Sequence, residues 1–322
     1  MKRLLKTSID NKIFLLLVAT ILFYVIIALF SDLSKILSHL NLLNYNYLII
    51  AFCLIFFSIL LRGFRYQIIL REIKINLRFF DSVSIFLAGM SMLVTPGGIG
   101  TIIKSYILKK KTGNSYSSTA PVIIYEKWLE LLSNTILIAV LLIWFDLLEA
   151  KIVLGVGIIL SITIFLFLKN PNMLKHFNKL IYKIVFFRKF ILDFEKFQDN
   201  TQHLINFQVL MKTLPITVSA QIPVFVSVFL IFQSFNLDFD IFATSQIYLT
   251  SISMGLLTMI PGGLIVTESG LLGILIQNNV EFSVASTLVL IIRLVTFWSV
   301  ILLGFIVLKF ILQNKTDFKN IS

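Results

Sequence analysis

The chain has 322 residues, of which 58% are hydrophobic, and it carries a formal net charge of +12. This composition contains more apolar side chains than a soluble core of that length buries, so we expect an integral membrane protein. Continuous apolar runs exclude a membrane β-barrel, whose strands alternate apolar and polar residues. The basic residues lie between these runs, which favours anionic lipid headgroups over nucleic acid as the partner.

Apolar segments recur along the whole chain and predict an all-α polytopic membrane helix bundle. Each segment is typical of a helix that crosses or enters a hydrocarbon core about 30 Å thick. The first one follows several basic residues and has no small-residue cleavage site, so we interpret it as a retained helix with a cytoplasmic N-terminus. The single cysteine, Cys53, is expected to be a small buried filler. The predicted segments are residues 13–30, 47–61, 79–95, 119–144, 152–168, 213–235, 241–260 and 282–308.

The stretch TPGGIGTIIKSYILKKK, residues 95–111, does not fit a simple span. The positive-inside rule places the Arg-rich and Lys-rich residues 62–78 in the cytoplasm. If 79–95 then crossed the membrane, the three lysines at 109–111 would lie outside, against that rule. Residues 99–108 rise only about 15 Å as a helix, half the hydrocarbon thickness. We therefore predict a re-entrant hairpin that enters from the cytoplasm, with its tip at 96–98.

The same pattern recurs in MIPGGLIVTESGLLGIL, residues 259–275, and predicts a second hairpin with its tip at 261–263, entered from outside. This layout gives about six full spans plus two hairpins, with both termini cytoplasmic. It describes an inverted-topology repeat with halves 1–150 and 151–322. Secondary transporters with such repeats keep their substrate sites between broken helices near the bilayer midplane. All 28 basic residues then lie on the cytoplasmic side except Lys35, Lys151, Lys127 and Arg293.

Residues 171–197 combine a helically spaced apolar face with a basic complement. They predict an amphipathic linker helix on the cytoplasmic leaflet. We expect it to bind anionic headgroups.

Several ionisable residues fall inside predicted membrane segments, where each charge costs on the order of 3 kcal/mol and should face the protein interior. Glu126, Glu130 and Asn134 share one helix face, with Lys127 at its edge. A structural ion pair between Lys127 and Glu130 is an equally good interpretation of these charges. Glu268 and Arg293 form the corresponding pair of the second half.

The helix that restarts after each PGG break directs its N-terminal N–H groups toward the membrane centre, where they could bind a phosphate. Lys104 and Arg293 would add full positive charges. The alternative is that the glycines serve only close helix packing. The pairing of two breaks in opposed halves favours a binding site.

The sequence contains no motif for ATP hydrolysis, Ser-His-Asp catalysis or metal binding. Ile103 stands where a Walker A loop needs a glycine before its lysine, so no ATPase is indicated. No Ser-His-Asp arrangement and no His or Cys cluster is present, so we expect neither a cofactor nor a metal.

The sequences PGGIGTIIKSYILKKKTG and VIIYEKWLELL, with PGGLIVTESGLLGIL and LIIRLVTFW, resemble the flippase-like transmembrane domain of lysylphosphatidylglycerol synthases. Stand-alone membrane proteins of the YbhN and AglD type share that domain. The resemblance extends from Arg62 and Arg65 to the last span, and we expect no cytosolic aminoacyl-transfer domain in this protein. It departs from the family pattern at Thr101, Ile265 and Thr267, which stand where Glu, Gly and Arg are usual.

The resemblance implies an inner-membrane lipid translocase, not an enzyme, for an anionic phospholipid or a polyprenyl-phosphate-linked lipid. An intramembrane transferase and an accessory scaffold for envelope glycosylation or lipid modification stay open as alternatives. A homodimer and envelope-modifying enzymes are further candidate partners. The residues expected to bind substrate are Arg62, Arg65, Pro96, Gly97, Gly98, Gly100, Lys104, Glu126, Lys127, Glu130, Pro261, Gly262, Gly263, Glu268 and Arg293.

Overall fold

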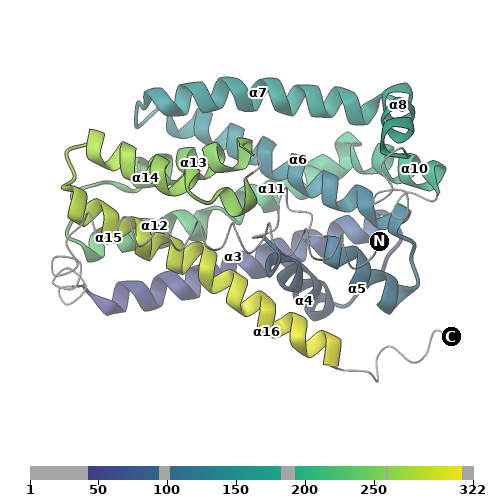
Figure 1. The fold of residues 1–322 in the computed structure, drawn as a ribbon, viewed down its shortest axis with the longest axis horizontal. Helices are drawn as coiled ribbons and strands as arrows, with labels where there is room; N and C mark the ends of the chain where they lie inside the picture. Colours follow the sequence, from purple (N-terminus) through teal and green to yellow (C-terminus); the bar gives the residue numbers. More distant parts are fainter. Residues whose placement is uncertain (1–42, 94–101, 183–192, 259, 314–322) are drawn as a thin grey trace, which may run out of the picture.

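The structure, a computed structural model, describes residues 43–93, 102–182, 193–258 and 260–313, and of 177–182 the backbone alone. The predicted first helix at 13–30 and the first hairpin tip at 96–98, with Gly100, lie outside these ranges. All regular elements within them are helical, which confirms the all-α prediction (Figure 1).

The first half contains α3 (Tyr45–Glu72), α4 (Phe79–Met90), α5 (Ile102–Thr112) and α6 (Tyr116–Leu141). The predicted second half begins within α7 (Leu148–Lys169) and continues with α8 (Pro171–Tyr182), α10 (Phe194–Leu204) and the elements that follow. These are α11 (Phe207–Ser219), α12 (Ile222–Ser234), α13 (Ile241–Leu257), η2 (Pro261–Gly263), α14 (Val266–Gln277), α15 (Phe282–Arg293), the π-helical η3 (Leu294–Trp298) and α16 (Ser299–Gln313).

Four continuous helical stretches in the described chain are long and apolar enough to cross a membrane: Tyr45–Glu72, Leu148–Lys169, Phe207–Ser234 and Phe282–Gln313. Helix α6 has 26 residues and is about 39 Å long, so it also has the length of a span. It carries three ionisable residues near its middle, Glu126, Lys127 and Glu130. The protein is therefore a multi-pass helical membrane protein.

The two predicted hairpins lie at opposite ends of the bundle. Helices α4 and α5 lie toward the right-hand end in Figure 1, and α13 and α14 lie toward the left-hand end. Helices α4 and α5 have 12 and 11 residues, so each rises only about 18 Å or less. Neither reaches across a hydrocarbon core about 30 Å thick.

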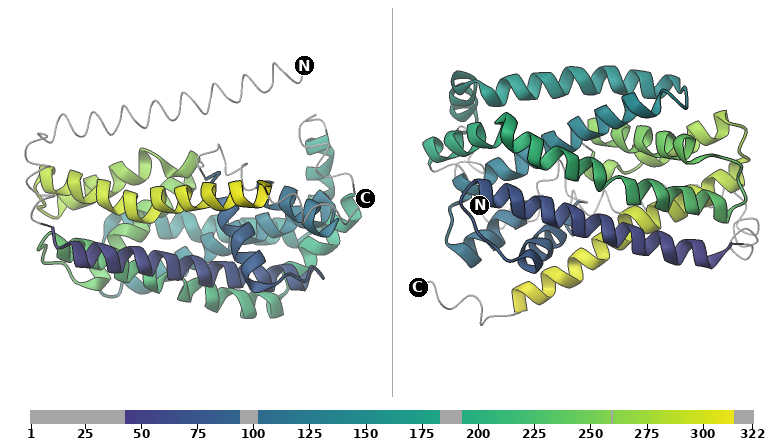
Figure 2. Two further views of the ribbon diagram at one scale, coloured as in Figure 1. Left: turned by 90° about the horizontal axis from the view of Figure 1, so that it is seen from below. Right: turned by 180° about the vertical axis from the view of Figure 1, so that it is seen from behind.

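The halves pack on each other reciprocally. Helix α6 of the first half contacts α13 of the second, and α16 of the second half contacts α4 of the first. Helices α3 and α12, which correspond in the predicted repeat, lie side by side (Figure 2). This exchange of equivalent contacts is what a two-fold axis between inverted halves produces.

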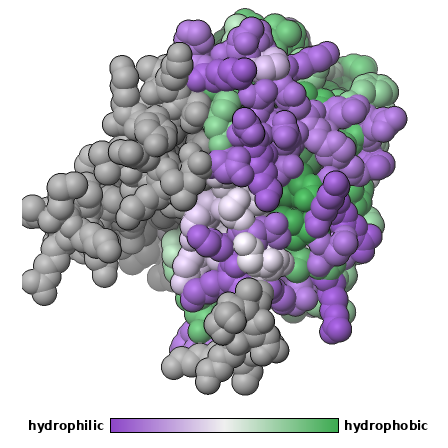
Figure 3. Space-filling model, turned by 90° about the vertical axis from the view of Figure 1, so that its right-hand side faces the viewer, coloured by the Kyte–Doolittle hydropathy of each residue, from purple (hydrophilic) through white to green (hydrophobic). Residues whose placement is uncertain are grey.

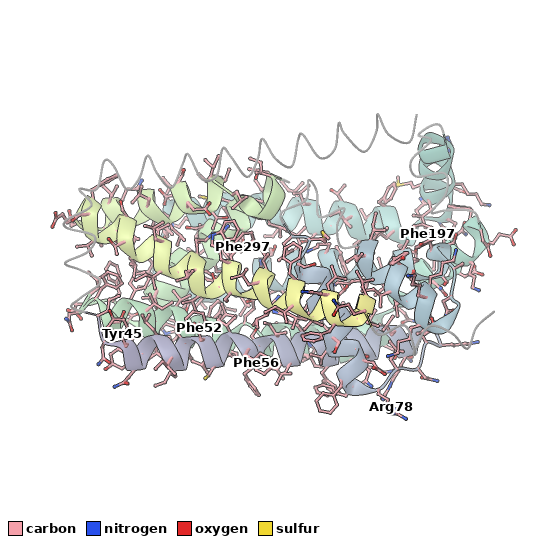
Figure 4. All side chains as sticks on the ribbon, turned by 60° about the horizontal axis from the view of Figure 1, so that its bottom comes forward. Tyr45, Phe52, Phe56, Arg78, Phe197 and Phe297 are labelled. Carbon is pink, nitrogen blue, oxygen red and sulfur yellow. The ribbon has the colours of Figure 1, made fainter. Side chains whose placement is uncertain are left out.

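Hydrophilic side chains gather at one end of the bundle, the right-hand end of Figure 1, as Figure 3 shows. Helices α5, α8 and α10 lie there. The sides of the bundle are apolar. Phe52 and Phe56 project outward from α3 (Figure 4) and are exposed, as expected for side chains that face lipid.

Three details differ from the sequence prediction. Helix α3 does not end near residue 61 but continues to Glu72, so Arg62 and Arg65 lie inside a span instead of a cytoplasmic loop. The predicted linker helix 171–197 is not one helix, because Asp193 has extended backbone angles and caps α10. Cys53 is exposed on α3, not buried, because it shares the outward face of that helix with Phe52 and Phe56.

Candidate functional site: two buried ion-pair clusters

The first cluster centres on Glu126 of α6, which is buried. Lys104 Nζ of α5 donates a hydrogen bond to Glu126 Oε2 at 3.0 Å. Arg65 Nη2 of α3 donates to Glu126 Oε1 at 3.3 Å. One carboxylate thus joins the returning limb of the first hairpin to two spans.

Glu130, one turn further along α6, extends the cluster. Lys127 Nζ lies 3.1 Å from its Oε2, which is the i,i+3 pair expected from the sequence. Arg65 Nη2 and Arg62 Nη1 lie 3.5 Å and 3.8 Å from its Oε1. These two arginines are three residues apart on α3 and therefore share a face.

The cluster lies deep in the bundle. At about 1.5 Å per residue, Glu126 is about 15 Å from the first residue of α6, and Arg62 is about 15 Å from the last residue of α3. This is close to the middle of a hydrocarbon core about 30 Å thick. Charges at that depth require partners, and the ion pairs supply them.

Uncharged polar groups connect the cluster to the second half. Gln221 lies at the break between α11 and α12 and accepts a hydrogen bond from Arg62 Nη2 at 3.1 Å. Its amide donates to Asn134 Oδ1 at 3.1 Å, and Asn134 donates to the Ser253 hydroxyl at 3.4 Å. The predicted stripe on α6 therefore contacts both α13 and the α11–α12 break.

The second cluster ties the second hairpin to the following span. Arg293 Nε donates to Glu268 Oε1 at 2.7 Å, and Arg293 Nη2 donates to the Gly262 carbonyl at 3.0 Å. The guanidinium carbon lies 4.1 Å from the centre of the Phe297 ring. Figure 4 labels Phe297, which is buried.

The backbone around the second break requires glycine. Gly262 and Gly263 have φ of 62° and 63°, a region that residues with a Cβ rarely adopt. A Cβ on Gly262 would overlap the Phe297 ring, and one on Gly263 would come within 2.6 Å of the Thr267 hydroxyl. Phe297 belongs to the π-helical turn η3, an irregularity frequent at functional sites.

The two ion pairs occupy equivalent places with opposite polarity. Lys104 and Glu268 are each the third residue of the limb that follows a break. Their partners, Glu126 and Arg293, lie in the next helix along the chain. In the first pair the cation, Lys104, lies on the short helix after the break. In the second pair the cation, Arg293, lies on the helix that follows.

The chain is similar in sequence to known membrane proteins. The profile of the family described as "Lysylphosphatidylglycerol synthase TM region" matches residues 14–304. The chain belongs to this family. A UPF0104 membrane protein of Methanocaldococcus jannaschii is 24% identical over 227 residues, which cover 69% of this chain and 94% of that protein. No solved structure matches the chain.

At one position where the sequence departs from the pattern of the lysylphosphatidylglycerol synthase TM region, the structure shows the backbone conformation that results. Ile265, where the family resemblance implies a glycine, has a φ of 71°. A β-branched residue with positive φ is an outlier. The backbone at the start of α14 therefore keeps a shape suited to glycine although the side chain is isoleucine.

Most of the predicted site residues in the described chain come together in two groups. Arg62, Arg65, Lys104, Glu126, Lys127 and Glu130 form the first cluster, and Gly262, Glu268 and Arg293 form the second. Pro261 and Gly263 adjoin the second cluster through η2. Pro96, Gly97, Gly98 and Gly100 lie outside the described residues.

Two residues beside the ion-pair clusters were not predicted from the sequence. Gln221 bridges Arg62 and Asn134, and its signal was a polar residue between Pro215 and Pro223 in an apolar run. Tyr248 of α13 is buried and lies near Thr296, Arg62 and Arg293. It lies between the clusters, and no sequence pattern marked it.

The described residues contain no group of three or more His, Cys, Asp or Glu side chains that could hold a metal ion. A surface hollow of about 790 Å³ lies where α3 ends, lined by Gln67, Arg71 and the loop to Phe79. Its lining includes no residue of either cluster. Among the described residues, the two ion-pair clusters are where charged side chains lie at the depth of the membrane interior.

Proposed function

We propose that this protein is a lipid translocase of the cell membrane, with both termini cytoplasmic. It moves an anionic phospholipid or a polyprenyl-phosphate-linked lipid between leaflets. The observation that carries the proposal is the pair of buried ion pairs, Lys104–Glu126 and Arg293–Glu268. Each joins the limb after a break to the next helix, from opposite ends of the bundle.

Buried ion pairs are a costly way to hold helices together, because desolvating both charges offsets much of their attraction. Apolar residues of similar volume would stabilise the bundle as well or better. Such charges in a membrane protein are typical of substrate pathways. In this proposal a lipid phosphate displaces the paired carboxylate from Lys104 or Arg293. The short helix after the break is then no longer held by its ion pair and moves. Glu126, Glu130 and Glu268 balance the charge during that exchange.

The test is lipid scrambling in proteoliposomes that contain the purified full-length protein. Fluorescent derivatives of phosphatidylglycerol, phosphatidic acid and a polyprenyl phosphate are placed in both leaflets, and a membrane-impermeant quencher reports their exchange. We expect exchange well above that of empty vesicles for at least one of these lipids. Rates equal to empty vesicles for all three would reject the proposal.

Two variants and one control sharpen the assay. Lys104→Gln and Glu268→Gln each remove one buried charge of an ion pair, and we expect both to slow exchange by tenfold or more. Lys151→Gln removes one charge of the exposed pair Lys151–Asp146, which lies outside both clusters, and should leave exchange unchanged. Mass spectrometry of the recovered lipids distinguishes transport from a transferase reaction, which would alter their mass.

A further inference from the structure

The charges of the first cluster do not balance. Four cations, Arg62, Arg65, Lys104 and Lys127, contact two carboxylates, Glu126 and Glu130, which leaves an excess of 4 − 2 = 2 positive charges. In the second cluster, Arg293 and Glu268 cancel. No other acidic residue forms an ion pair with the first cluster in the part of the chain that the structure describes.

The cations differ in accessibility. The Arg65 side chain is fully buried, and that of Lys104 is 6% exposed. The Arg62 and Lys127 side chains are 18% and 40% exposed, and both contact Glu130. Arg65 and Lys104 are the buried cations and both contact Glu126, while Arg62 and Lys127 form a more accessible pair around Glu130.

This exposed pair lies in the middle of two membrane-length helices, α3 and α6. A lysine side chain that faced hydrocarbon there would cost several kcal/mol, so its exposed surface must face a hydrated crevice or a polar ligand. A second feature strengthens the positive potential. Lys104 lies in the first turn of α5, at the positive end of that helix dipole.

One buried donor in the cluster has no acceptor among the described residues. The Nε of Arg65 is buried and makes no hydrogen bond with any described residue. Buried donors of this kind usually have a partner, such as water or a ligand. The excess charge and this donor belong to the same site.

From these observations we infer that the first cluster selects a headgroup phosphate with two negative charges, a phosphomonoester, bound by Arg62 and Lys127. This inference rests on the proposed function, since it names the class of lipid that the translocase takes. A phosphodiester headgroup carries one charge and neutralises half of the excess. A monoester neutralises all of it, with one charge from Arg62 and one from Lys127, and its bonds to them are charge-assisted.

The experiment measures binding to the purified full-length protein in detergent. The probes are dioctanoyl phosphatidic acid and farnesyl phosphate as monoesters, dioctanoyl phosphatidylglycerol as the diester, and inorganic phosphate as the free anion. At pH 8 we expect both lipid monoesters to bind about tenfold more tightly than the diester, the effect of one additional charge-assisted hydrogen bond. Equal affinity for monoester and diester, or no binding of either, would overturn the inference.

The pH dependence gives a second readout. The dianion of a phosphomonoester takes up one proton near pH 6 and becomes a monoanion. Its affinity should therefore fall toward that of the diester between pH 8 and pH 5.5, while the affinity of the diester stays level. If inorganic phosphate binds as tightly as the lipids, charge selection is supported and the ligand is a free anion instead of a lipid.

Charge variants distinguish binding at this site from nonspecific electrostatic attraction of anionic lipids to the protein. Arg62→Gln and Lys127→Gln each remove one excess charge and should reduce the preference for monoester over diester several-fold. Lys212→Gln removes an exposed lysine paired with Glu72 outside the cluster and should keep the preference. A preference unchanged in both cluster variants, with thermal unfolding like that of wild type, would refute the assignment.

The outcomes also distinguish this inference from the proposed function. If the protein moves phosphatidylglycerol and phosphatidic acid at the same rate and binds them equally, the translocase stands and the charge selection fails. If it binds monoesters selectively but moves no lipid in proteoliposomes, the translocase proposal fails and the binding site stands.

Discussion

Arg293→Gln is the substitution whose effect on stability follows most directly from the structure. The side chain is buried and donates to Glu268 at 2.7 Å and to the Gly262 carbonyl at 3.0 Å. Removing one partner of a buried ion pair costs about 3–5 kcal/mol, because the other charge stays buried. Loss of the contact with the Phe297 ring adds about 0.5–2 kcal/mol, and the glutamine amide recovers part of the hydrogen bonding. We expect the free energy of unfolding to fall by about 4 kcal/mol.

The assay is chemical denaturation of the purified protein in mixed micelles, followed by tryptophan fluorescence. The double variant Arg293→Met with Glu268→Leu removes both charges and should unfold within about 1–2 kcal/mol of wild type. Lys151→Gln breaks an exposed pair and should change stability by less than about 0.5 kcal/mol. A loss below about 1 kcal/mol for Arg293→Gln, or a double variant as unstable as the single one, would refute the reasoning.

Three further predictions concern the two hairpins. Gly262→Ala places a Cβ against the Phe297 ring at a φ of 62°, so we expect about 1–3 kcal/mol lower stability by the same denaturation assay. Ile265→Gly relieves a φ of 71° and should raise stability by about 1 kcal/mol; no rise would show that the surroundings hold that backbone without strain. Lys110→Cys, in a Cys53→Ala background, should react with an impermeant maleimide only from the cytoplasmic side. Labelling in intact cells would contradict the topology of the first hairpin.

The sequence predicted the hairpins because their signals are local. A PGG break, a limb too short to span and a following run of lysines lie within 17 residues, at 95–111. The Lys127–Glu130 pair was predictable for the same reason, since residues three apart on a helix are neighbours. The Glu268–Arg293 pair followed from the equivalence of the two halves.

The extent of α3 was not predicted, because the stabilising partners are distant in sequence. Arg62 and Arg65 look like the start of a cytoplasmic loop when charge is read along the chain. Arg65 instead pairs with Glu126, 61 residues away, and Arg62 bonds to Gln221, 159 residues away. Those partners satisfy the charges inside the membrane and let the helix continue. Only the packing of α3, α6 and the α11–α12 break brings them together.

The inverted repeat predicted from the sequence would make the two halves equivalent in topology, but the two clusters differ in electrostatics. The second cluster is neutral, so when Arg293 and Glu268 separate, each side chain needs a new partner of the opposite charge. The first cluster has an excess of two cations whether or not Lys104 holds Glu126. Charge changes in the first half should therefore alter which anion binds. Charge changes in the second half should alter how firmly the hairpin is held. If variants of Arg62 and Arg293 had the same effect on headgroup preference, this division between the halves would be wrong.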